Sequence, residues 1–211
     1  MKTFLFQGDS ITDADRIREN VDNFGYGYPN ILASKYLSEN INEFKFVNKG
    51  ISGNRVVDLY ARIKVDIINL KPDYMSILIG INDVWHELSA GNGVDNEKFK
   101  KILSMLIEEV KEALPEIKII MLEPFVLKGP ATEEKWDIFR SETELRANSV
   151  KEVAEKYNLN FVPLQNKFDE LSKNIETTYW LADGVHPTAA GHGVISKALS
   201  EEFEKIAFNQ K

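Results

Sequence analysis

The sequence predicts an α/β protein, a parallel sheet with helices on both of its faces, and two observations lead to that expectation. Short β-rich runs alternate along the chain with longer stretches in which apolar residues recur every three or four positions. The chain has 211 residues, 43% of them hydrophobic and 28% charged, which suits one domain with a sizeable core. No internal repeat, low-complexity tract or linker interrupts it, so residues 1–211 are expected to form a single domain.

Five short apolar segments are expected to be the strands. The third is the clearest, because Tyr74–Ile79 is a nearly continuous apolar run, as in a strand buried on both faces. The five segments are Lys2–Gln7, Glu43–Val47, Tyr74–Ile79, Lys118–Leu122 and Asn160–Pro163.

The intervening stretches are expected to be helices. In Asn96–Leu114 the apolar residues recur at three and four, and Pro115 lies just past the end. The other predicted helices are Tyr28–Ser38, with Ile31, Leu32, Tyr36 and Leu37 near one face, Val56–Leu70, Thr143–Tyr157, and a last helix that begins near Pro187 and carries Ile195, Leu199, Phe203 and Ile206.

Two expectations concern the segments between and within these elements. Val126–Asp137 contains Gly129-Pro130 and is the least regular stretch, so it is expected to be a surface loop that flanks the site. Met75, Met105 and Met121 are expected in the core.

Four polar, glycine-containing segments follow predicted strands. They are Gly8–Thr12, Gly50–Asn54, Gly80–Asp83 and Asp183–Pro187. Ligands of an open parallel sheet bind outside the carboxyl ends of its strands. These segments, far apart in the sequence, are therefore expected to meet at one edge of the sheet.

The residue types in these segments suit acyl transfer. A serine such as Ser10 is a weak nucleophile that is usually deprotonated by histidine as it attacks. The histidine requires a carboxylate that fixes its tautomer, and Asp183 stands three residues before His186 in a turn-like stretch. The oxyanion requires hydrogen-bond donors, and the backbone of Gly53 and the amide of Asn82 can provide them.

Each of these residues also has a plain structural interpretation. Ser10 can cap the helix that follows it. Gly53 can be a turn glycine and Asn82 an Asx-turn residue. Asp9 is expected to be structural, holding the nucleophile loop through backbone N–H groups. The coincidence of four such segments favours the catalytic interpretation for Ser10, Gly53, Asn82 and His186.

Four other aromatic or histidine positions have weaker assignments. Trp85 and Trp180 either line the acyl or sugar pocket or belong to the core. His192, between two glycines, is expected to be a packed structural histidine. His86 is expected near the mouth of the site, without an assigned role.

Composition excludes several other classes of function. The net charge of −7 and the lack of a Lys/Arg stripe argue against nucleic acid and against an anionic membrane surface as partner. No cysteine is present, and no histidine has a partner at metal-ligand spacing, so neither a metal nor any other cofactor is expected. The N-terminus lacks the pattern of a secretory signal and no apolar run approaches about 18 residues, so a cytoplasmic location is expected.

The four segments resemble the four blocks of the SGNH (GDSL-type) hydrolase superfamily, in the same order and over almost the whole chain. The resemblance implies a flavodoxin-like three-layer fold with strand order 2-1-3-4-5. It implies a catalytic triad of Ser10 as nucleophile, His186 as base and Asp183 as its orienting carboxylate. The implied oxyanion hole consists of the Ser10 and Gly53 amides and the Asn82 side chain. Self-association into a homo-oligomer is implied as well.

Two segments, Val47–Asn54 and Gly80–Trp85, look like those of intracellular acetylxylan esterases, which remove acetyl groups from xylo-oligosaccharides. The chain departs from these enzymes before Asp183, where Ala182 replaces an aromatic residue. We therefore expect a serine ester hydrolase that removes O-acetyl groups from xylo-oligosaccharides or similar carbohydrates. The alternatives are a short-chain lipase, lysophospholipase or thioesterase of the same superfamily, or a non-catalytic carbohydrate or flavin binder on the same fold.

Overall fold

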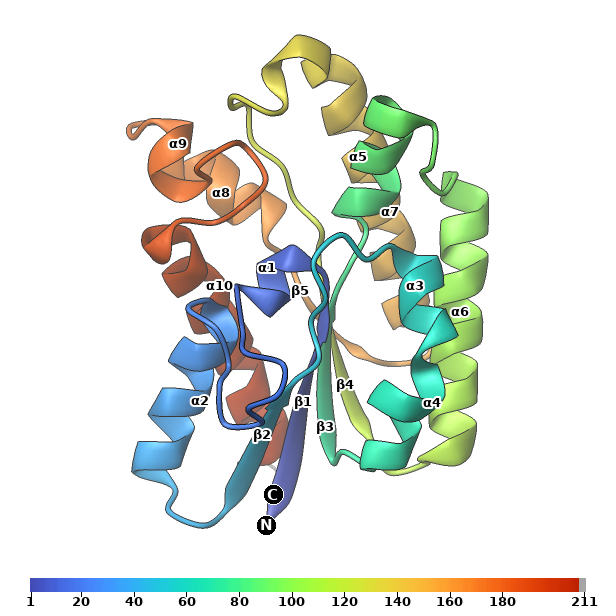
Figure 1. Ribbon diagram of the computed structural model, residues 1–211, viewed down its shortest axis with the longest axis vertical. Helices are drawn as coiled ribbons and strands as arrows, with labels where there is room; N and C mark the ends of the chain where they lie inside the picture. Colours follow the sequence, from blue (N-terminus) through green and yellow to red (C-terminus); the bar gives the residue numbers. More distant parts are fainter. Residues whose placement is uncertain (209–211) are drawn as a thin grey trace.

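The computed structural model describes residues 1–208 and has a five-stranded parallel sheet at its centre (Figure 1). The spatial order of the strands is β2-β1-β3-β4-β5, as the family resemblance implies. The strands are β1 (Lys2–Gly8), β2 (Phe44–Asn48), β3 (Tyr74–Leu78), β4 (Lys118–Leu122) and β5 (Asn160–Val162).

The register of the strands aligns their carboxyl ends. Gly8 at the end of β1 is level with Leu78 at the end of β3, and Leu78 is level with Leu122 of β4. On the other side of β1, Asn48 of β2 is level with Phe6. The segments that follow β1, β2 and β3 therefore leave the sheet at one edge.

Helices cover both faces of the sheet (Figure 1). One face packs against α2 and α10, in a core rich in aromatic residues such as Phe4, Phe6 and Phe203. The other face packs against α3, α6 and α7 through aliphatic side chains such as Leu5 and Leu103. The helices are α1 (Ser10–Asp13), α2 (Tyr28–Glu39), α3 (Val56–Ala61), α4 (Ile63–Asp66), α5 (Ile81–Ala90), α6 (Asn96–Ala113), α7 (Trp136–Lys156), α8 (Gln165–Leu171), α9 (Thr177–Trp180) and α10 (Ala189–Ala207), with short 3-10 turns η1 (Ile68–Leu70) and η2 (Glu133–Lys135).

The predicted helix over Val56–Leu70 is wrong in its continuity, because three short pieces, α3, α4 and η1, replace it. The break after α3 falls at Arg62, whose guanidinium donates hydrogen bonds to the Lys49 carbonyl at 2.8 Å and to Asn54 Oδ1 at 2.9 Å. This arginine thus ties the helical segment to the loop that follows β2.

The boundaries of two other predicted segments also differ from the structure. Helix α7 begins at Trp136, seven residues before the predicted start at Thr143. The segment Val126–Asp137 is not wholly a surface loop, because Val126, Leu127 and Thr132 are buried. It does lie against the predicted site, since the Ala131 N–H donates to the Asp183 carbonyl at 2.9 Å.

Helices α5, α8 and α9 are not predicted from the sequence, because each is short and lacks a long apolar period. Met105, predicted in the core, is instead 37% exposed. Of the four apolar residues predicted near one face of α2, Leu32 and Tyr36 are buried, whereas Ile31 and Leu37 are 39% and 43% exposed.

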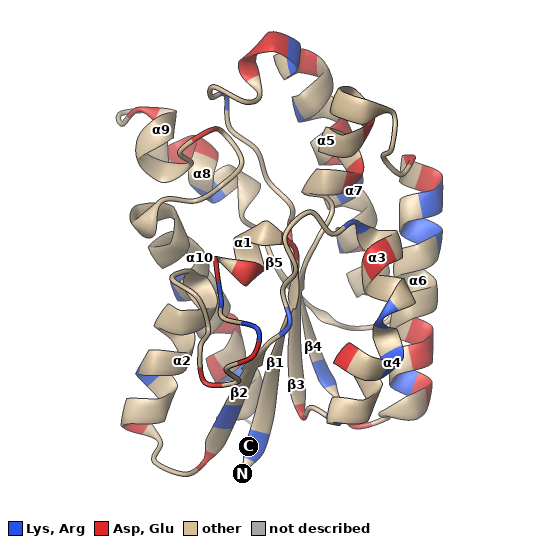
Figure 2. Cartoon of the chain, viewed as in Figure 1, with Lys and Arg blue, Asp and Glu red and all other residues tan. Residues whose placement is uncertain are grey.

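Charged residues cover the outer helices without separating by sign. Figure 2 shows Lys and Arg interspersed with Asp and Glu along α6. Within residues 1–208, no helix has the length and apolar character needed to cross a lipid bilayer.

Candidate active site

The turn after β1 presents Ser10 at the carboxyl edge of the sheet. Asp9 is the N-cap of α1, and its Oδ1 accepts a hydrogen bond from the Ile11 N–H at 3.0 Å. The turn requires glycine at position 8, because a Cβ there would lie 2.2 Å from Thr12 Oγ1 and 2.5 Å from the Leu78 carbonyl oxygen. Ser10 therefore starts a helix directly behind a buried strand, and its side chain remains partly accessible.

Ser10, His186 and Asp183 form a hydrogen-bonded chain. Ser10 Oγ lies 3.0 Å from His186 Nε2. On the other side of the ring, His186 Nδ1 lies 2.7 Å from Asp183 Oδ2. The two ring nitrogens thus contact a hydroxyl and a carboxylate, the arrangement that lets an imidazole act as a general base.

The turn between Asp183 and His186 holds the carboxylate in place. Asp183 Oδ1 accepts hydrogen bonds from the backbone N–H of Val185 at 2.9 Å and of His186 at 2.7 Å. Gly184 has φ of +99°, a conformation in which a side chain is strained. The three-residue spacing predicted to bring carboxylate to imidazole therefore does so through a tight turn.

The electrostatics of this pair favour its charged form. Burial alone would raise the pKa of Asp183, but the hydrogen bonds from the His186 ring and from the two backbone N–H groups lower that pKa to about 2. The same hydrogen bond with Asp183 raises the pKa of His186, against the effect of burial. The carboxylate stays ionised at neutral pH and stabilises an imidazolium at His186.

The predicted oxyanion-hole residues converge on the same edge. Gly53 follows β2 with φ of +81°, and Asn82 begins α5 after β3. Asn82 Nδ2 donates to the Asn54 carbonyl at 3.1 Å, which joins the two segments. Within residues 1–208, neither the Ser10 nor the Gly53 N–H donates a backbone hydrogen bond, so both remain available to a ligand.

Buried carboxylates that the sequence reasoning missed hold these donors in position. Asp13 Oδ2 accepts hydrogen bonds from the Ser52 N–H at 2.9 Å and from its hydroxyl at 3.1 Å. Asp83 accepts from the Val56 N–H, at the start of α3. Both lie in the segments that carry Ser10 and Asn82, and their burial in the fold is what distinguishes them from other acidic residues.

The two tryptophans differ in their relation to the triad. The Trp85 ring lies 5.7 Å from the His186 ring and 6.0 Å from that of Phe139, between centroids. Trp180 instead packs against Tyr179, at 4.9 Å, at the end of α9. A hollow of about 170 Å³ adjoins Trp85 and Phe139.

His192 is a packed histidine, as expected. It is 2% exposed, and its Nδ1 accepts a hydrogen bond from the Tyr28 N–H at 3.1 Å. Burial lowers its pKa to about 4, so the ring is neutral and keeps this acceptor at neutral pH. It anchors the start of α2 rather than taking part in the chain of Ser10, His186 and Asp183.

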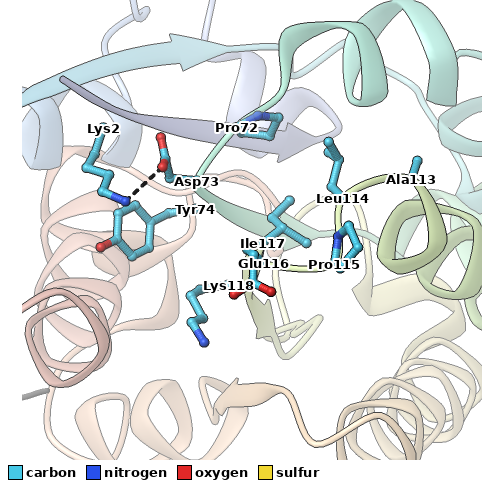
Figure 3. Close-up of a pocket in the computed structure, with 10 residues that line it drawn as sticks. All are labelled: Lys2, Pro72, Asp73, Tyr74, Ala113, Leu114, Pro115, Glu116, Ile117 and Lys118. Carbon is cyan, nitrogen blue, oxygen red and sulfur yellow. Dashed lines mark ion pairs between the residues drawn. The ribbon is translucent and has the colours of Figure 1, made fainter.

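A larger cavity lies at the opposite edge of the sheet (Figure 3). It has a volume of about 430 Å³ and is lined by the amino ends of β1, β3 and β4, with Lys2 and Asp73 forming an ion pair at 3.0 Å. Its lining contains no serine or histidine, so it lacks the groups needed for the chemistry at Ser10. Within residues 1–208, no three His, Cys, Asp or Glu residues are arranged to hold a metal ion.

Asp9 offers a stability test of the nucleophile turn. It is 1% exposed, its Oδ2 has no hydrogen-bond partner among the described residues, and burial raises its pKa from 3.8 to about 7. The stability that the protonated carboxyl contributes is therefore complete below about pH 4 and is lost as the pH rises through about 7. Between these two pH values, the contribution of Asp9 to the free energy of unfolding falls by about 1.4 kcal/mol per pH unit.

Asp9→Asn is expected to be more stable than the original protein at about pH 8, and the difference should shrink towards pH 4. An asparagine oxygen can still accept from Ile11, whereas no charge is buried. Urea unfolding of both proteins at about pH 5 and pH 8 measures the effect. A difference in unfolding free energy that is the same at both pH values would contradict this interpretation of Asp9.

Comparison with known proteins shows which proteins this chain resembles. The sequence model of the GDSL-like lipase/acylhydrolase family matches residues 6–194. An acetylxylan esterase of Geobacillus stearothermophilus is 37% identical over 211 residues, which cover 94% of this chain and 92% of that protein.

Solved structures extend the similarity to three dimensions. The crystal structure of Axe2, an acetylxylan esterase from G. stearothermophilus, has a TM-score of 0.85 and 34% identity, covering 98% of this chain and 94% of that one. A structure from Parabacteroides merdae, provisionally described as a GDSL-like lipase, has a TM-score of 0.90 and 36% identity, covering 95% and 94% of the two chains.

Variants of Axe2 with known structures bear on individual residues of that enzyme. Three are described as catalytic mutants, with alanine in place of a serine, an aspartate or a histidine, the last two standing three positions apart. Another has isoleucine in place of a tryptophan directly before that aspartate. In the present chain Asp183 and His186 keep the spacing of three, whereas the residue before Asp183 is Ala182.

Proposed function

The chain belongs to the GDSL-like lipase/acylhydrolase family, a family of carboxylic ester hydrolases, and on that premise we propose that it removes short acyl groups from carbohydrate esters through Ser10, His186 and Asp183. The observation that carries the proposal is the continuous chain of hydrogen bonds, 3.0 Å from Ser10 Oγ to His186 Nε2 and 2.7 Å from His186 Nδ1 to Asp183 Oδ2.

In the first half of the reaction, Ser10 Oγ attacks the ester carbonyl while His186 Nε2 takes its proton. Asp183 holds the ring so that Nδ1 carries a hydrogen and Nε2 is free to accept. The oxyanion that forms lies against the Ser10 and Gly53 amides and the second amide hydrogen of Asn82. Each such donor contributes about 3–4 kcal/mol to transition-state stabilisation.

In the second half, His186 returns the proton to the departing alcohol, which leaves an acyl group on Ser10. His186 then takes a proton from water, the resulting hydroxide attacks the acyl carbon, and the acid is released as Ser10 recovers its proton. The bonds and protons balance over the two halves of the reaction, so the proposed mechanism requires no cofactor.

An acetyl ester of a xylo-oligosaccharide is the proposed substrate. The identity of 37% with an acetylxylan esterase supports it. The Trp85 ring supports a small acyl group, because it lies 5.7 Å from the His186 ring and packs against Phe139, which limits the room beside the triad. A lipase or lysophospholipase would need room for a longer chain.

A series of 4-nitrophenyl esters tests the acyl preference. kcat/KM is expected to be highest for acetate and to fall steeply beyond butyrate, because the Trp85 ring beside His186 limits the room for longer chains. Acetate release from acetylated xylo-oligosaccharides then tests the alcohol. A maximum at octanoate or longer would instead favour the lipase alternative, and a protein inactive on every ester would favour a binding module.

A further inference from the structure

His86 lies on the face of α5 that carries Asn82. The two residues are four positions apart, so their side chains stand one above the other on the helix. Gly53 has open space above its Cα, and the nearest atom that an added Cβ would meet is His86 Cε1, at 4.0 Å. The His86 imidazole therefore borders the open space above Gly53, next to the oxyanion hole.

The ring of His86 is half-buried and has no hydrogen-bond partner in the described part of the chain. The histidine ring hydrogen bonds found in residues 1–208 are those of His186 and His192. A neutral imidazole has one donor and one acceptor nitrogen, which matches a hydroxyl group that both donates and accepts. A half-buried ring with both nitrogens unused is suited to bind a polar ligand group.

The surroundings of His86 make this flank of the site polar. The carboxylate of Asp58 lies close enough to interact with His86 through its charge, and Arg55 Nε holds that carboxylate at 3.0 Å. The neighbouring residue Trp85 points to a different surface, where it packs against Phe139 and the His186 ring. Helix α5 thus presents an apolar flank at Trp85 and a polar flank at His86, on either side of Asn82.

We propose that His86 is a specificity residue that hydrogen-bonds a hydroxyl of the alcohol half of the ester and so favours esters of polyhydroxylated alcohols. The apolar flank at Trp85, whose ring lies 5.7 Å from that of His186, then receives the acyl group. This inference rests on the proposed function, because it assigns the alcohol side of the site built around Ser10. It places selectivity for carbohydrate on a residue outside the triad and the oxyanion hole.

The test compares an ester with hydroxyl groups on its alcohol with one that has none. kcat/KM is measured on monoacetylated xylobiose and on 4-nitrophenyl acetate for the original protein, His86→Ala, His86→Gln and, as a control, Ser141→Ala. Ser141 is an exposed residue of α7 whose hydroxyl bonds the Ile138 carbonyl, so it is a control outside the site. Thermal unfolding of each variant confirms folding.

The ratio of kcat/KM for the sugar ester to that for the aryl ester is expected to fall about tenfold in His86→Ala, mainly through KM, since one neutral hydrogen bond is lost. His86→Gln, whose amide also donates and accepts, should recover about half of that loss on a logarithmic scale. Ser141→Ala should keep the original ratio.

If His86→Ala leaves kcat/KM unchanged on both esters, the inference is overturned and the proposed esterase remains intact. If kcat/KM falls equally on both esters, the inference is also overturned, because His86 would then act on the oxyanion hole and not on the alcohol. If the original protein cleaves the aryl ester but releases no acetate from the sugar, both the inference and the proposed carbohydrate substrate fail. Loss of the serine mechanism itself would show separately, as activity on 4-nitrophenyl acetate that survives Ser10→Ala.

Discussion

Ser10→Ala is expected to lower kcat on 4-nitrophenyl acetate by at least about 10⁴-fold, because no other group in the site can form the acyl-enzyme. The side-chain hydrogen bond that the substitution removes is the one to His186 Nε2 at 3.0 Å. The oxyanion donors and the binding surface remain, so a small residual rate above that in buffer is expected.

Stability separates loss of chemistry from loss of fold in this variant. Ser10 is partly accessible, so its replacement by alanine should change the free energy of unfolding by less than about 1 kcal/mol. Ser141→Ala, an exposed serine on α7, serves as the control and should retain full activity. If Ser10→Ala keeps more than about a tenth of the original kcat while Ser141→Ala is normal, Ser10 is not the nucleophile.

Asp183→Asn is expected to lower kcat by about 10³–10⁴-fold, the second largest effect. The carboxylate accepts from His186 Nδ1 at 2.7 Å, which leaves Nε2 free to take the proton of Ser10. An asparagine amide can donate to Nδ1 instead, which places the ring hydrogen on Nε2 and blocks proton transfer. The measurement is kcat on 4-nitrophenyl acetate, with folding checked by circular dichroism.

The pH profile gives an independent check on the same pair. The hydrogen bond with Asp183 raises the pKa of His186 above its ordinary value of 6.5, and the protonated ring cannot act as a base. kcat/KM of the original protein should therefore fall on the acid side with an apparent pKa above about 6.5. In Asp183→Asn, the residual activity should fall at a lower pH than in the original protein. If the apparent pKa of this acid-side fall is the same in both proteins, Asp183 does not set the protonation of His186.

The strand pattern could be predicted from the sequence because buried parallel strands are continuous apolar runs. Lys118–Leu122 is a strand in the structure with those same bounds, and each of the other strands differs by one residue at one or both ends. The strand order came from the family resemblance and is confirmed. Apolar periodicity alone does not specify which parallel strands are neighbours.

Helix continuity was harder to predict where side-chain contacts far along the chain decide it. The period over Val56–Leu70 favours one helix, yet Arg62 turns to bind Lys49 and Asn54, and the chain bends there. Met105 has the type of a core residue, but it lies on the outer side of α6 and is 37% exposed. The break at Arg62 and the exposure of Met105 both depend on tertiary contacts, which a local sequence pattern does not contain.

The candidate site was predicted more completely than the residues that support it. Ser10, Asp183 and His186 are recognisable because their chemistry requires those residue types together. Asp13 and Asp83 are carboxylates like many others in the sequence, and only the fold shows that they are buried against Ser52 and Val56. The role proposed for His86 likewise depends on the fold, which places its Cε1 4.0 Å from the position of an added Cβ at Gly53.

The central claim is that Ser10 is a nucleophile activated by His186, and covalent labelling tests it most directly. The protein is treated with a fluorophosphonate, digested, and analysed by mass spectrometry, with the His186→Ala variant treated in parallel. The account predicts one adduct, on the peptide that contains Ser10, formed rapidly in the original protein and at least about 100-fold more slowly without His186. An adduct on another residue, or labelling of Ser10 at the same rate without His186, would contradict it.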